Sequence, residues 1–191
     1  MMGMVFTEFL ELVESRFSPE VADRIITAAA TATDGAYTAV GNYDHAEMVR
    51  MVQALSVETQ VPVEELVRVF GHHLAVRFSH LYGAFFASQP SLFDFLASVD
   101  SKIHVEVRKR HPAGELPSIQ SCERTTDSQT LIYRSSRHMP DLALGLIQGA
   151  AVHYGQPVEV EHSSLPDGGV RFVVKLTNTQ AGPAKADAST A

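Results

Sequence analysis

The feature that most constrains the fold is a change of hydrophobic period at Pro117. Before this proline, apolar residues recur every three or four positions, which is typical of amphipathic helices. After it, pairs of short segments alternate between apolar and polar residues, which is typical of strands. The chain is therefore expected to have an α+β fold, with a helical N-terminal half packed on a small sheet.

Capping residues predict where two of the helices begin. Ser18 stands directly before Pro19, and a hydroxyl followed by a proline at the first helical position is a typical helix start. Asp44 with Glu47 three residues later has the spacing of a capping box, and this helix is expected to run through Val57.

A third helix is expected to open at Pro62 and to lie in the core, because it carries a continuous apolar stripe. The stripe consists of Leu66, Phe70, Leu74, Phe78 and Leu81. A short helix is expected to start at Ser91, and a further helix to run from about Val99 to Arg110.

The second half predicts two β-hairpins with one helix between them. Residues 118–125 and 129–137 flank a polar turn and form the first hairpin, and residues 157–162 and 170–176 form the second. The apolar helix between them is expected to run from about Pro140 to Gly155. Together the hairpins make a four-stranded antiparallel sheet.

Length, charge and cysteine content limit the organisation and the partners. With 191 residues, 45% of them hydrophobic, residues 1–178 are expected to form one domain and the small, polar residues 179–191 a disordered tail. A net charge of -7 argues against nucleic acid as a partner, because phosphate binding requires lysine and arginine. The single cysteine, Cys122, excludes an intramolecular disulfide. With neither a signal peptide nor an apolar run that could span a bilayer, the protein is expected to be soluble and cytoplasmic, without a membrane partner.

The strand predicted at residues 129–137 carries a group suited to anions. Side chains alternate across a regular strand, so Tyr133, Ser135 and Arg137 are expected on one face. Two hydroxyls and a guanidinium suit a carboxylate or phosphate. On chemistry alone, an exposed and solvated strand face is the more frequent explanation of such a pattern.

His104 is the histidine with the most specific surroundings. It lies between Ile103 and Val107 on a partly apolar helical face, where a hydrogen-bonded core histidine is more frequent than a metal ligand. Glu106 points to another side of the helix, which disfavours a zinc-type pairing with His104. Neither a phosphate loop nor a nucleophile elbow is present, so the sequence does not indicate an enzyme.

The order and separation of His104 and the Tyr-x-Ser-x-Arg motif at Tyr133, Ser135 and Arg137 resemble the haem-nitric oxide/oxygen binding (H-NOX) family. The resemblance spans residues 1 to about 176. Further motifs that carry it are Asn42-Tyr43, Phe70-Gly71, Ser98-Val99-Asp100, Ile103-His104-Val105-Glu106-Val107, Glu115-Leu116-Pro117 and Cys122-Glu123-Arg124.

The resemblance implies a haem b cofactor and assigns roles to residues of this chain. His104 is the implied proximal ligand to the haem iron, Tyr133, Ser135 and Arg137 hold the propionates, and Pro117 packs against the haem. The implied distal side is apolar, with Val5, Phe9, Leu74, Phe78, Leu142 and Leu146 as its candidates.

The resemblance also bears on the gas and on the output. Oxygen-binding members carry a distal tyrosine where this chain has Leu142, so nitric oxide is the expected ligand and carbon monoxide a further one.

The chain ends soon after its last strand, so output is expected through a separate histidine kinase or cyclic-di-GMP enzyme. The alternative is a haem-free anion-binding or interaction module on the same fold, and a haem enzyme has less support. Many bacterial members also bind zinc through cysteines, but this chain has Ser163 and Ser164 beside His162, which argues against zinc binding through that pattern.

Overall fold

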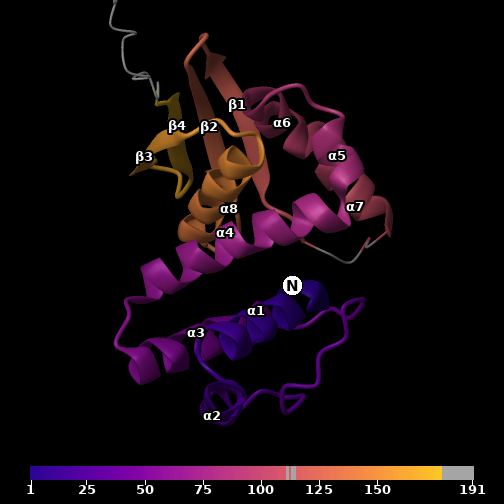
Figure 1. The fold of residues 1–191 in the computed structure, drawn as a ribbon, viewed down its shortest axis with the longest axis vertical. Coiled ribbons are helices and arrows are strands. Elements are labelled where there is room, and N and C mark those ends of the chain that lie inside the picture. The colour runs from indigo at the N-terminus through magenta and orange to yellow at the C-terminus, as the bar shows by residue number, and fades with distance from the viewer. Residues whose placement is uncertain (111, 113–114, 178–191) are drawn as a thin grey trace, which may run out of the picture.

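The computed structural model describes residues 1–110, 112 and 115–177, so the predicted tail at 179–191 lies outside it. The helices in Figure 1 are α1 (Gly3–Arg16), α2 (Pro19–Ala29), α3 (His45–Thr59), α4 (Val63–Leu81), α5 (Gly83–Ala87), α6 (Leu92–Ser98), the π-helix η1 (Val99–Ile103), α7 (His104–Arg110) and α8 (Pro140–His153). The strands are β1 (Ser118–Arg124), β2 (Ser128–Arg134), β3 (Val158–Ser164) and β4 (Val170–Leu176).

The predicted helix starts are present, but the predicted capping box is wrong. Asp44 accepts a hydrogen bond from the backbone N–H of Ala46 at 3.0 Å, as an N-cap does. The carboxylate of Glu47 does not reach back to the helix start, because it is buried and accepts a hydrogen bond from the hydroxyl of Tyr37 at 2.6 Å. Burial, together with this hydrogen bond, raises the pKa of Tyr37 to about 12. A tertiary contact therefore replaces the local one.

Helix α4 separates two hydrophobic cores. Leu66, Phe70 and Leu74 pack into a first core with α1, α2 and α3, whereas Phe78 contacts both this core and a second one. The second core lies between α6, α8 and the sheet. Leu81, predicted on the same stripe, is 50% exposed because α4 ends at this residue. Figure 1 shows α1, α2 and α3 on the side of α4 away from the sheet.

The contact between α4 and α8 requires glycine. A Cβ atom on Gly145 would lie 2.0 Å from the carbonyl oxygen of Arg68, and one on Gly71 would lie 2.3 Å from that of Leu142. Both neighbouring atoms belong to the backbone, which cannot move aside as a flexible side chain can. The two helices therefore pack backbone against backbone, and α8 is held firmly between α4 and the sheet.

The sheet has the order β1-β2-β4-β3, with all neighbours antiparallel. Each predicted hairpin is present, and pairing of β2 with β4 joins the two into one sheet. The predicted fold class is confirmed: helices precede a four-stranded antiparallel sheet, with α8 between the hairpins. Gly155, two residues after α8, has a φ of 60°, the left-handed conformation expected of a glycine after a helix end.

The predicted extension of the second strand to residue 137 is wrong. Strand β2 ends at Arg134, because its neighbours reach no further: Ser118 at the start of β1 pairs with Arg134, and Val170 at the start of β4 pairs with Tyr133. The chain then turns, and the N–H of Arg137 donates to the hydroxyl of Ser135 at 3.1 Å. Tyr133, Ser135 and Arg137 therefore do not share one regular strand face.

Among the helices of the described residues, none is long and apolar enough to cross a membrane.

Candidate functional site

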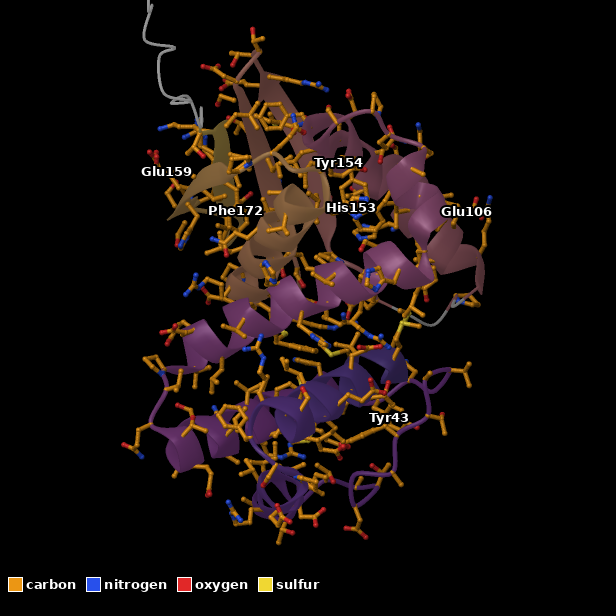
Figure 2. The ribbon with its side chains drawn as sticks, in the orientation of Figure 1. Tyr43, Glu106, His153, Tyr154, Glu159 and Phe172 are labelled. Atoms are coloured by element: carbon orange, nitrogen blue, oxygen red, sulfur yellow. The ribbon has the colours of Figure 1, made fainter. Side chains whose placement is uncertain are left out.

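A cavity of about 250 Å³ lies in the second core, between α4, the segment from α6 to α7, α8 and the inner face of the sheet. This is many times the roughly 10–15 Å³ that one water molecule needs. Its lining is mostly apolar, with His104, Glu106, Tyr82 and Tyr133 as polar exceptions. In Figure 2, Phe172 marks the sheet side of this region and Glu106 the α7 side. The lining is suited to an apolar ligand that makes few polar contacts.

His104 is held at the cavity wall by Asp100. The Nδ1 atom of His104 lies 2.9 Å from Oδ1 of Asp100, and the imidazole is 12% exposed. Because an ionised carboxylate only accepts hydrogen bonds, Nδ1 is the donor, and the neutral ring then carries its lone pair on Nε2. The other oxygen of Asp100 accepts a hydrogen bond from the hydroxyl of Ser118 at 3.1 Å. This chain of contacts fixes the orientation of the ring.

The helix predicted from Val99 to Arg110 is divided just before His104. Residues Val99–Ile103 form the π-helix η1, and α7 begins at His104 itself. Short π-helical turns are rare and occur frequently at functional sites. The contact between Asp100 and His104 was missed in the sequence analysis, although a separation of four residues places the two side chains on one side of a helix.

The structure brings together part of the predicted site. The predicted residues that line the cavity are Phe78, His104, Pro117, Tyr133, Leu142 and Leu146. The other predicted distal residues, Val5, Phe9 and Leu74, pack instead in the first core. Ser135 and Arg137 lie in the turn after β2, beyond the lining residues. The roles of all these residues toward a cofactor stay predictions.

Arg137 is anchored beside the entry to β1. Its Nη2 atom donates a hydrogen bond to the backbone carbonyl of Glu115 at 2.6 Å, two residues before Pro117 in the cavity wall. This contact uses one of the five N–H donors of a guanidinium. The remaining donors suit an anionic group at the rim of the cavity.

Among the described residues, Tyr133 and Tyr82 carry the hydroxyl groups of the cavity lining. Tyr133 is buried, and within the described residues its hydroxyl forms no hydrogen bond, so it is suited to a polar group of a ligand. The hydroxyl of Tyr82 contacts the sulfur of Met4 at 3.4 Å. Sequence reasoning missed Tyr82, although it follows Phe78 by four residues and thus continues the α4 stripe.

The described residues contain no group of three histidine, cysteine or acidic side chains that could hold a metal ion. Among the described residues of these types, His104 and Glu106 line the cavity, so a metal there would need further ligands from a bound group. Cys122 is exposed and is not among the residues that line the cavity. Its thiol faces the backbone carbonyl of Gln120. An apolar cavity with one imidazole, oriented by a carboxylate, is typical of proteins that bind haem through an axial histidine.

Comparisons with known proteins identify the family within this class. The family model described as Haem-NO-binding matches residues 2–162. An H-NOX protein from K. algicida, in its Fe(II) unliganded form, superposes with a TM-score of 0.89 at 35% identity, covering 96% of this chain and 100% of that one. An H-NOX protein from S. oneidensis in the Fe(II)NO state superposes with a TM-score of 0.86 at 22% identity, over 93% and 100% of the two chains. No curated protein matched.

The chain therefore belongs to the Haem-NO-binding (H-NOX) family, whose members are haem-based gas sensors. The resemblance inferred from sequence is confirmed.

Proposed function

We propose that this protein binds haem b through His104 and senses nitric oxide at the ferrous iron. The observation that carries the proposal is the position of His104 in the wall of an apolar cavity, with Nδ1 2.9 Å from a carboxylate oxygen of Asp100. Such an acceptor favours the tautomer in which Nε2 carries the lone pair. A neutral imidazole oriented by such a contact is a suitable axial ligand. When bound, the haem supplies the iron at which a diatomic gas coordinates.

Other residues at the cavity suit the propionates and the macrocycle of a haem. Tyr133 offers a hydroxyl without a partner among the described residues, and Arg137, with Ser135 in the same turn, offers guanidinium donors near the rim. We assign these three residues to the propionates. Pro117 and Phe78 are assigned to packing against the macrocycle.

The gas preference is inferred from Leu142. This side chain lines the cavity and cannot donate a hydrogen bond. Bound oxygen is stabilised by such a donor, whereas nitric oxide binds ferrous haem strongly without one. Tyr82 is the competing donor, since it also lines the cavity, but its hydroxyl contacts Met4. Nitric oxide is therefore the proposed signal, and carbon monoxide would bind the same site.

The contacts of His104 suggest how a signal leaves the site. The imidazole is linked to η1 through Asp100 and to β1 through Ser118, so its displacement moves both elements. We propose that a separate protein in the cytoplasm, such as a histidine kinase or a cyclic-di-GMP enzyme, detects this change. The protein itself is assigned no catalytic step.

Haem reconstitution of the purified protein tests the proposal. We expect an intense Soret band that is lost in His104→Gly and restored when free imidazole is added to that variant, because the imidazole can occupy the space of the missing ring. His80→Gly, which removes an exposed histidine from the last turn of α4, should keep the wild-type spectrum. If His104→Gly keeps that spectrum without imidazole, the ligand assignment is wrong. If the wild-type protein takes up no haem, the haem-free anion-binding module is the better description.

A further inference from the structure

A second hollow lies on the outside of the molecule, where α1, α4 and α8 meet. We call it the α1–α4–α8 groove; it has a volume of about 470 Å³. Its apolar lining comes from Leu12, Val69 and Val76, and its basic lining includes Arg16, Arg68 and His72. The volume lies within the range of roughly 300–1,000 Å³ that is usual for small-molecule sites.

The charge of the groove is opposite to that of the chain. The chain has a net charge of -7, yet within its described part no acidic side chain lines the groove. Arg16 has no ion pair with any described residue, and Arg68 faces Glu65 at 3.6 Å in an exposed pair of the kind that contributes little. Both guanidinium groups are therefore suited to an anion from outside.

The nearest buried carboxylate does not offset this charge. Glu8, on the next turn of α1, lies behind His73 and receives a hydrogen bond from Arg77 at 2.7 Å, so it already has a cation partner. Within the described chain, the carboxylates that contact the basic lining are thus Glu65, in an exposed pair with Arg68, and Glu8, beside His73, and Arg16 remains available to an anion.

Apolar surface continues beside the two arginines. Leu12 is buried and forms the floor, whereas Val69 is 41% exposed on the wall. Val76, one helical turn after His72 on α4, adds a third apolar side chain to the lining. A bare inorganic anion would leave this surface in water, whereas a hydrocarbon chain would cover it.

We propose that the α1–α4–α8 groove binds an amphiphilic carboxylate, with the carboxylate on Arg16 and Arg68 and the hydrocarbon part on Leu12 and Val69. Helices α4 and α8 line both this groove and the large cavity, with different residues. The bound molecule would thus contact the two helices that form the outer wall of the proposed haem site. The inference itself depends only on the groove.

Calorimetric titration of the purified protein with decanoate tests the proposal, with inorganic phosphate as the comparator. Decanoate should bind and phosphate should bind much more weakly. Arg16→Gln should weaken decanoate binding about tenfold, the usual loss for one charge-assisted contact. Val69→Ser should weaken it about fivefold, through lost apolar contact. Both positions are on exposed helix surface, and thermal unfolding checks that each variant remains folded.

Two matched controls separate the groove from general effects. Arg171→Gln removes an exposed arginine from β4, and Val57→Ser removes a valine from α3 that is 74% exposed; both should leave decanoate affinity unchanged. Equal effects of the groove variants and their controls would overturn the proposal, as would the absence of decanoate binding. Phosphate binding as strong as decanoate binding would show a bare-anion site and would also overturn it.

Discussion

Removal of the Asp100 carboxylate is the sharpest test of how the site holds His104. In Asp100→Ala, Nδ1 of His104 loses an acceptor at 2.9 Å, and the hydroxyl of Ser118 loses one at 3.1 Å. Loss of such a contact to a metal-bound histidine typically weakens metal binding by about 10–100-fold. Asp100 is 29% exposed, so water can replace part of the contact, and we expect a change near tenfold.

The rate at which haem is lost to an excess of an apo-haem acceptor protein measures this effect. We expect Asp100→Ala to lose haem about tenfold faster than the wild type, and Asp100→Asn, which keeps a neutral acceptor, to lie between them. The iron–histidine stretching frequency should also fall, because a less basic imidazole binds iron more weakly. Asp23→Ala, at an exposed position of α2, should change neither quantity. If Asp100→Ala leaves both the rate and the frequency at their wild-type values, our account of His104 is refuted.

Three further predictions concern the gas, the helix contact and acid stability. Leu142→Tyr, which adds a hydroxyl to the cavity wall, should produce a long-lived ferrous oxygen complex that the wild type lacks; a stable oxygen complex of the wild type, seen by absorption spectroscopy, would contradict the selectivity argument. Gly145→Ala should destabilise the fold by up to about 3 kcal/mol, because its Cβ would meet the carbonyl of Arg68 at 2.0 Å, and should lower the midpoint of thermal unfolding by about 6–12 °C. Gly83→Ala, where a Cβ meets nothing within 4 Å, is the control, and equal melting of both variants would disprove the close contact. The hydrogen bond from Arg124, followed by that from Ser91, lowers the pKa of Asp94 below its ordinary 3.8. Stabilisation by this depressed pKa is present above pH 4 and is lost as the pH falls through the folded-state value, so urea unfolding should show the advantage of the wild type over Asp94→Asn shrinking below about pH 4.

Local signals in the sequence determined most of the secondary structure. Ser18 before Pro19 begins α2, the apolar stripe from Leu66 to Phe78 lies on α4, and both hairpins form where alternation predicts them. Capping and periodicity depend on residues only a few positions apart, so no tertiary information is needed to read them. The Haem-NO-binding family could likewise be inferred from the spacing of its motifs.

Tertiary packing alone decided which of these residues meet. Strand β2 ends at Arg134 because its partner strands begin opposite it, and Glu47 leaves its helix start because Tyr37 lies within reach. The apolar pattern of α4 is the same toward either core, so it could not show that Leu74 faces the first core and Phe78 both. Which partner a side chain finds depends on segments far away in the sequence, and only the folded chain brings these together.

The change of period at Pro117 thus determined the α+β fold class by itself. The site, in contrast, depends on contacts between residues before and after Pro117. The position of His104 was evident from its motif. Its contact with Asp100, which in turn accepts a hydrogen bond from Ser118, required the π-helical turn at Val99–Ile103 and the start of β1 to be packed side by side. The α1–α4–α8 groove has no sequence signal of its own, because its lining comes from three helices that only the fold places together.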